Sequence, residues 1–103
     1  PGFGGKLLGS EAKAKLKIPN KSFAMRIDYI VNWGHRRALG KNVLKAGLRK
    51  GDVVLSVNGK SDFKNGDHFH SWVRLACSVG QTLKIKVFRN GKTDLVELKL
   101  VEG

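Results

Sequence analysis

The sequence predicts a small α+β domain, mainly β, built from four or five strands, one longer helix and two short helices. Three observations lead to this class. Apolar and polar residues alternate in several short stretches, two Asn-Gly pairs fit tight turns, and one segment carries apolar residues at helical spacing. With 103 residues, of which 41% are hydrophobic, the chain has the size of one globular domain.

The first half of the chain contains one predicted helix and one predicted strand. Ser10 can cap a short helix over 11–18, which Pro19 and Asn20 should end. The alternation in 22–31 predicts a half-buried strand. Its inward face should carry Phe23, Met25, Ile27 and Tyr29. Residues 32–42 are polar and punctuated by glycine, which predicts a loop, and 43–48 can form a single helical turn.

The second half predicts a strand, a helix and a hairpin. The strand 52–57 should end at the turn Asn58-Gly59. Asp67 can cap a helix over 68–78, which carries Phe69, Val73, Ala76 and Cys77 on one face, with Trp72 and Leu75 at the flanks. Asn90-Gly91 predicts a two-residue hairpin. Its first strand should bury Leu83, Ile85 and Val87, and its second Val96, Leu98 and Leu100.

The charge is strongly positive and unevenly distributed. Twenty Lys and Arg against eight Asp and Glu give a net charge of +12. Residues 1–51 hold twelve basic and two acidic residues, whereas 52–103 hold eight and six. Such a field attracts acidic partners, whether peptide, nucleic acid or an anionic surface. The alternative function is therefore a basic domain that binds nucleic acid or an anionic surface. The segment that favours it is Trp33 beside His35, Arg36 and Arg37, because an aromatic ring among cations can stack on bases and contact phosphates.

Catalytic and metal-binding motifs are missing from the sequence. No Ser has the Gly-x-Ser-x-Gly setting, and Cys77 lies in an apolar stretch without a base. Gly5-Lys6 is followed by Leu7 where a phosphate loop needs Ser or Thr. His68 and His70 diverge on their helix, with no acidic or cysteine ligand spaced to help. We expect no enzyme activity in this segment, no cofactor and no metal. No apolar run is long enough to span a membrane.

The segment AGLRKGDVVLSVNGK (46–60) resembles the core signature of PDZ domains. The helix that follows, and the hairpin VGQTLKIKVFRNGKTDLVELKL (79–100), resemble the end of bacterial PDZ domains. The resemblance is strong over 46–100 and moderate over 2–31, whereas 32–45 is longer than expected and matches nothing. It implies a single domain over 1–103, a partly open five- to six-stranded β-barrel or sandwich. One longer helix and one or two short helices would cap it.

The order of elements resembles the permuted bacterial type, as in the high-temperature-requirement family of serine proteases. GFGG (2–5) sits where the carboxylate-binding loop of that type opens the domain, and EAKAKLKIP (11–19) resembles the helix after it. The resemblance implies that amides around Gly2–Gly4 hold a ligand's terminal carboxylate, while its backbone adds as a strand beside 4–8. The expected peptide-binding residues are Gly2, Phe3, Gly4, Gly5, Lys6, Leu7, His68, Trp72 and Leu75. Carboxylate binding and strand addition are both physically sound, since glycine-rich turns bind anions and open sheet edges bind strands.

Several of these assignments have plain structural alternatives. Phe3 and Leu7 can be ordinary core or edge residues, His68 can be a surface histidine beside a cap, and Trp72 can pack on the barrel. We expect a regulatory or substrate-recruiting module of a larger bacterial protein such as a protease, in the periplasm or cell envelope. Its partner would be a peptide or protein C-terminus, with Lys6, Lys13, Lys15 and Lys17 favouring acidic ligands. A structural dock without a free ligand, and any oligomeric state, stay open.

Overall fold

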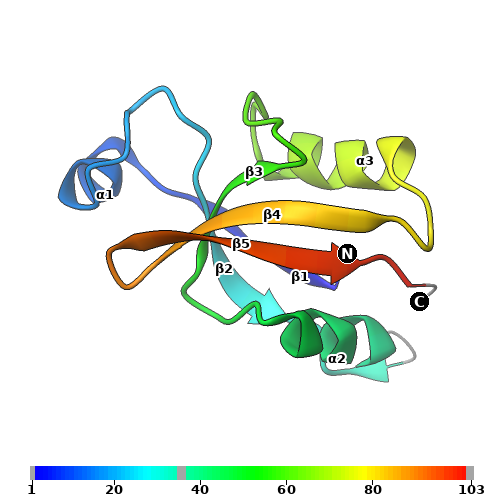
Figure 1. The fold of residues 1–103 in the computed structure, drawn as a ribbon. Helices are drawn as coiled ribbons and strands as arrows, with labels where there is room; N and C mark the ends of the chain where they lie inside the picture. The colour runs from blue at the N-terminus through cyan, green and yellow to red at the C-terminus, as the bar shows by residue number, and fades with distance from the viewer. Residues whose placement is uncertain (1, 35–36, 102–103) are drawn as a thin grey trace.

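The computed structural model describes residues 2–34 and 37–101, and it confirms a mainly β, α+β domain. One open antiparallel sheet has the strand order β1-β2-β3-β4-β5. The strands are β1 (Phe3–Leu7), β2 (Met25–Ile30), β3 (Val53–Val57), β4 (Thr82–Arg89) and β5 (Lys92–Lys99). The helices are α1 (Ser10–Lys15), α2 (Arg37–Ala46) and α3 (Gly66–Ala76). Figure 1 shows α1 at one end of the sheet and α2 and α3 toward the other end. No helix of the described segments is both long and apolar enough to cross a membrane.

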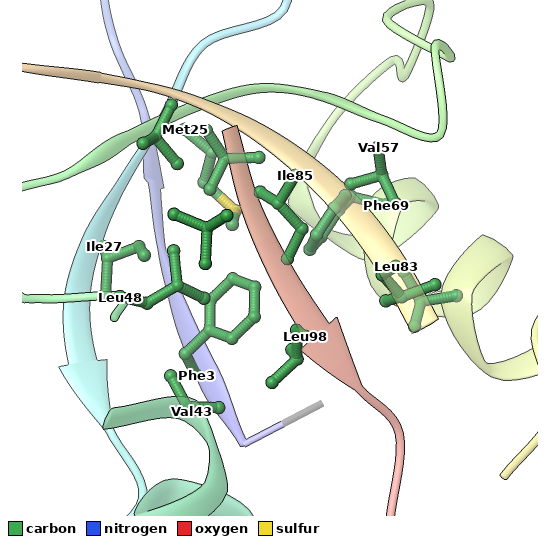
Figure 2. Packing of buried hydrophobic residues seen from close by; sticks show 14 of the residues in the cluster. Phe3, Met25, Ile27, Val43, Leu48, Val57, Phe69, Leu83, Ile85 and Leu98 are labelled. Atoms are coloured by element: carbon green, nitrogen blue, oxygen red, sulfur yellow. The ribbon is translucent and has the colours of Figure 1, made fainter. Parts of the chain in front are cut away.

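The main hydrophobic core lies between one face of the sheet and the helices α2 and α3. Figure 2 shows Phe3 of β1 packed among side chains from β2, α2 and β5. The predicted alternation of β4 is confirmed, because Leu83, Ile85 and Val87 are all buried while Lys84 and Lys86 are exposed. The helices contribute Val43 from α2 and Phe69 and Val73 from α3.

The opposite face of the sheet, here called the outer face, carries a much smaller cluster. Ile18, Ala24 and Val53 are its buried members, and α1 itself buries no residue. Helix α1 ends in a Schellman motif. The Lys17 N–H donates to the Ala14 carbonyl (3.1 Å) and the Ile18 N–H to the Lys13 carbonyl (2.8 Å). Lys17 occupies the left-handed position of this motif, with φ +60°.

Strand β2 differs from the predicted alternation in its second half. Met25 and Ile27 are buried as expected, but Tyr29 is 44% exposed and Ile30 is buried instead. The cause is a register shift: Gly4 pairs with Tyr29 and Gly5 with Ile27, so Asp28 is an extra residue in β2. A bulge of this kind moves the inward positions by one residue. The expectation that Tyr29 points inward was therefore wrong.

Residues 37–46 form helix α2, where a polar loop over 32–42 and a single helical turn over 43–48 were expected. Gly40, taken as a loop glycine, lies in the buried face of this helix, where a Cβ would lie 1.6 Å from the Val31 carbonyl oxygen. Glycine thus allows α2 to approach the end of β2. The Asn42 amide donates to the Lys99 carbonyl (2.6 Å), which ties the helix to β5. His35 and Arg36, part of the basic segment considered above, lie outside the described residues.

The helix starts differ from the sequence-based expectations by one or two residues. The Asn65 side chain caps α3 by accepting from the His68 N–H (2.8 Å), so Asp67 is a first-turn acidic residue and not the cap. Gly9 occupies the cap position of α1 without a side-chain hydrogen bond, so Ser10 does not cap it. Both Asn-Gly turns are confirmed, since Asn58 and Asn90 each have φ +52° and are followed by glycines with positive φ.

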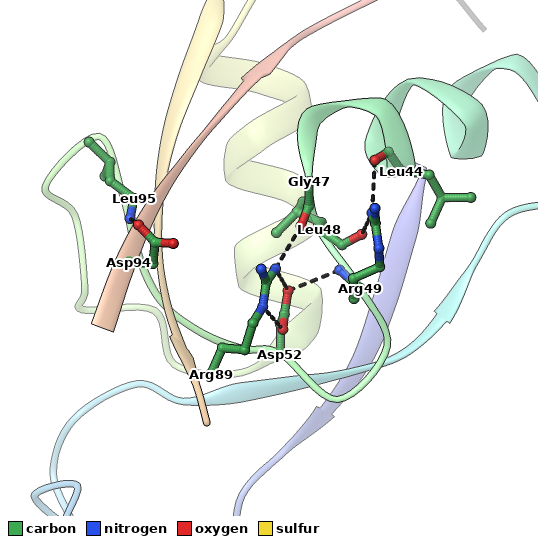
Figure 3. Close-up of polar contacts among 8 residues, drawn as sticks. All are labelled: Leu44, Gly47, Leu48, Arg49, Asp52, Arg89, Asp94 and Leu95. Carbon is green, nitrogen blue, oxygen red and sulfur yellow. Dashed lines mark hydrogen bonds and ion pairs between the residues drawn. The ribbon is translucent and has the colours of Figure 1, made fainter. Parts of the chain in front are cut away.

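The Gly-Asp pair of the signature segment supports the fold. Asp52 is 2% exposed, and its carboxylate accepts from the Arg49 N–H (2.9 Å) and the Arg89 Nε (2.6 Å). The Arg89 Nη2 also donates to Asp52 and to the Gly47 carbonyl. Figure 3 shows that this network joins the turn after α2 to the end of β4. Asp52 is thus a buried structural anchor.

Candidate functional site

Strand β1 forms an edge of the sheet, because β2 is its one partner strand among the described residues. The Gly2 carbonyl accepts from the Val31 N–H (2.8 Å), and the Leu8 N–H donates to the Ala24 carbonyl (2.9 Å). Backbone groups alternate in direction along a strand, and the extra residue of the bulge lies in β2. The N–H and C=O groups of Phe3, Gly5 and Leu7 therefore point away from β2, toward the free edge.

The start of β1 borders a cavity of about 500 Å³. Phe3 of β1 and Gly2 just before it contribute to its lining, and α3 forms a facing wall. The α3 wall consists of His70, Val73 and Arg74, continued by Cys77 just after the helix. The Phe3 and Phe69 rings lie 6.1 Å apart, which holds β1 and α3 together beside this cavity.

The remaining lining is largely apolar. Tyr29 and Val31 come from β2 and the residue after it, Leu39 comes from α2, and Val79, Leu100 and Val101 come from the segments that flank the C-terminal hairpin. Trp33, which is 57% exposed, lies next to this region with its ring 6.1 Å from that of Tyr29. A hydrophobic side chain can therefore enter the cavity beside the free edge of β1.

Glycines at the start of β1 bring the backbone close to its neighbours. Gly2 has φ +103°, and a Cβ there would lie 2.8 Å from the Leu39 backbone. A Cβ on Gly4 would lie 2.3 Å from the Tyr29 hydroxyl, and one on Gly5 would lie 1.6 Å from the Arg26 carbonyl oxygen. The glycine-rich start, expected to serve ligand approach, is thus also required for β1 to pack on β2 and α2.

The predicted helix residues lie on the other flank of α3. The His68 Nδ1 accepts from the Lys64 N–H (2.9 Å), and its ring is edge-on to Phe63 at 5.7 Å. Trp72 also packs edge-on to Phe63, at 5.5 Å, and the Lys60 Nζ lies 5.9 Å from its ring. Leu75 is 82% exposed. None of the three lines the cavity at β1, and their role in binding stays a prediction.

The β1 residues predicted for the site are divided between the core and the surface. Phe3 is 2% exposed and belongs to the main core, with one side on the cavity. Lys6 is exposed and Leu7 is 41% exposed, and both lie farther along the edge toward α1. Strand β1 thus offers a buried apolar residue at its start and exposed side chains at its end.

Only Gly2 and Phe3 of the cavity lining were predicted as site residues; on the α3 side, His70, Val73, Arg74 and Cys77 were missed. His70 was considered only as a metal ligand, while Val73 and Cys77 were assigned to the core face. Helical spacing does hold the signal: with Phe69 and Val73 on the core face, positions 70, 74 and 77 fall on one flank and 68, 72 and 75 on the other. Spacing alone does not say which flank faces β1.

The electrostatics of the cavity favour an anion. Arg74 lines it, and no Asp or Glu of the described residues does. Burial lowers the pKa of His70 below its ordinary value, so its imidazole is neutral at pH 7. Burial also raises the pKa of the Cys77 thiol, which keeps it protonated and unreactive. Among the described residues, no three His, Cys, Asp or Glu side chains gather as a metal site.

One comparison with known proteins bears on this geometry. A protein-family model described as PDZ domain matches residues 41–100, which is more than half of the chain. The match begins within α2, runs to the end of β5 and so includes the signature segment, the Asp52 network and α3. PDZ domains are protein-interaction modules and are typically non-catalytic. The chain therefore belongs to the PDZ domain family.

Proposed function

We propose that this domain binds the extended C-terminal segment of another protein in the groove between β1 and α3. The observation that carries the proposal is the free edge of β1, whose outward N–H and C=O groups lie beside the apolar cavity. An added strand would gain main-chain hydrogen bonds from this edge, and the cavity would receive one side chain. Membership in the PDZ family supports peptide binding in general.

In this arrangement the ligand's terminal carboxylate lies at the start of β1. At this point of β1 the Phe3 N–H points to the free edge and can donate to the carboxylate, and Arg74 supplies a positive charge at the same cavity. The last side chain would contact Phe3, Val73 and Leu39, which favours an apolar residue at that position.

A bias toward acidic ligands would arise upstream of the ligand's C-terminus. Lys6 lies on β1 and α1 follows its far end, so Lys13 and Lys15 are near the start of the bound segment and away from the cavity (Figure 1). Carboxylates several residues before the C-terminus would meet these lysines. Because exposed charges are screened by salt, this part of the affinity should fall between low and high ionic strength.

A nuclear magnetic resonance titration of the ¹⁵N-labelled domain tests the proposal. The probe is a peptide from a C-terminal library, used once with a free carboxylate and once amidated. We expect shifts at β1 and the α3 wall, and a loss of affinity of about 10-fold or more on amidation, because hydrogen bonds to a charged group are lost. Equal affinity of both peptides, or chemical-shift changes confined to other surfaces, would contradict the proposal.

Two histidine variants decide which flank of α3 faces the ligand. His70→Ala should weaken peptide binding, whereas His68→Ala should leave it nearly unchanged, because only His70 lines the cavity. The reverse result would show that the ligand contacts the flank of α3 that was expected from the sequence. A random single-stranded oligonucleotide, titrated in parallel, tests nucleic-acid binding as the rival function.

We further propose that the domain serves a larger bacterial protein of the cell envelope, such as a protease, as a regulatory or substrate-recruiting module. The support is the resemblance of the hairpin segment to bacterial PDZ domains and the order of elements, in which the glycine-rich segment and α1 precede β2 as in the permuted type. We expect the parent protein to join this domain to a protease. We also expect mutations in the groove to abolish substrate capture by that protein.

A further inference from the structure

A second hollow lies on the outer face of the sheet, separate from the peptide groove. It has a volume of about 600 Å³ and lies between the α1–β2 connection and strands β3 and β4. Its apolar walls are Leu16, Ile18 and Pro19 from the connection, and Leu55 and Phe88 from the sheet. The hollow exists because the short α1 buries no residue and covers this face incompletely, so Leu16, Leu55 and Phe88 stay only partly buried.

The rim of this hollow is polar and positively charged. Lys17 and Lys86 line it, together with the hydroxyl residues Ser22, Ser56, Ser61 and Thr93, and no Asp or Glu of the described residues does. Neither lysine makes a side-chain hydrogen bond or ion pair with another residue in the part of the chain that the structure describes. Their charges are therefore available to a ligand.

The backbone at Lys17 is an independent sign that its side chain matters. Lys17 holds the left-handed position that ends α1, with φ +60°, where glycine would fit at lower cost. Non-glycine residues in this region are uncommon and gather at functional sites. Here the strained backbone places a lysine beside an apolar hollow.

The shape of the site argues for a small molecule and against an added strand. Strand β4 is paired with β3 on one side and β5 on the other, and β3 pairs with β4 along its length and with β2 at Val53 and Val54, so β4 offers the hollow no free backbone edge. Its volume is in the range of about 300–1,000 Å³ that is usual for small-molecule sites, which are apolar with a few placed polar groups. We propose that this hollow binds a free aliphatic carboxylate, whose chain lies on Leu55 and Phe88 and whose head group meets Lys17 and Lys86.

Decanoate, kept below its micelle-forming concentration, is the probe for this site. The experiment follows amide shifts of the ¹⁵N-labelled domain during titration with decanoate, octanoate and decanol. We expect shifts at β3, β4 and the residues after α1. Decanol should bind more weakly because it lacks the charge, and each methylene removed should weaken binding by up to about 4-fold.

Matched lysine variants locate the head group. Lys17→Gln and Lys86→Gln should each weaken decanoate binding about 3- to 5-fold, as for one partly exposed charge pair. Lys15→Gln and Lys84→Gln remove the same charge two residues away, from exposed positions that do not line the hollow, and should change binding less than 2-fold, by the same charge-pair reasoning. Lys17→Gly should weaken binding while raising the thermal midpoint.

Three outcomes would overturn the inference: no shifts at the hollow, equal binding of decanoate and decanol, or equal effects of all four glutamine variants. The peptide groove supplies an independent reference. Decanoate should bind with the same affinity when the groove is filled by a C-terminal peptide, so failure of either site can be told from failure of the other.

Discussion

Replacing Asp52 by alanine should destabilise the domain strongly, although Asp52 lines neither the peptide groove nor the outer hollow. Its side chain is 3% exposed and receives hydrogen bonds from the Arg49 N–H and from two nitrogens of Arg89. Removing one partner of a buried pair costs about 3–5 kcal/mol. The Arg89 side chain is 33% exposed and can turn toward water, so we expect the lower end, about 3 kcal/mol.

Urea unfolding followed by the fluorescence of the two tryptophans measures this loss. Asp62→Ala is the matched control, because it breaks an ion pair whose carboxylate is 80% exposed and should leave stability nearly unchanged. Asp52→Asn should fall between the two, since an amide oxygen can still accept from the Arg49 N–H. A loss for Asp52→Ala no larger than for Asp62→Ala would refute the assignment of Asp52 as a buried anchor.

Two further predictions concern β1 and the cavity. Gly5→Ala should destabilise the domain by about 2 kcal/mol or more, because its Cβ would lie 1.6 Å from the Arg26 carbonyl oxygen and β1 would have to move. Gly66→Ala has open space and should be neutral or slightly stabilising; equal losses would contradict the argument. Burial lowers the pKa of His70 in the folded state, so the unfolded chain binds its proton more readily. Stability should therefore fall as the pH drops below about 6.5, and His70→Gln should flatten this slope in thermal melts at pH 5 to 7.5. An unchanged slope would show that His70 is not responsible.

The core of the sheet could be predicted from the sequence because burial alternates strictly where the register is regular. Leu83, Ile85 and Val87 were placed correctly from spacing alone, and both Asn-Gly turns followed from backbone chemistry. The same rule failed at Tyr29, because the bulge in β2 comes from its pairing with β1. A strand's own sequence does not contain that pairing.

A helical turn was predicted over 43–48, but the first half of α2 was missed because Gly40 was taken for a loop signal. Gly40 is buried against the Val31 carbonyl, a tertiary contact that overrides the low helix propensity of glycine. Similarly, the core face of α3 was assigned correctly from Phe69 and Val73, but the flank that faces β1 depends on how the chain crosses the sheet. The binding role of the β1 residues stays a prediction from the sequence, and the residues of the wall opposite them could be named only from the structure.

The order of strands in the sheet follows their order in the chain, and β1 pairs with a single strand. The outward N–H groups of Phe3, Gly5 and Leu7 have no partner strand among the described residues, so they can exchange through small local openings. An occupant of the groove would turn this outermost strand into an internal one. Ligand binding should then slow amide exchange in β1 more than in the other strands. This difference would report occupancy of the groove without any label on the ligand.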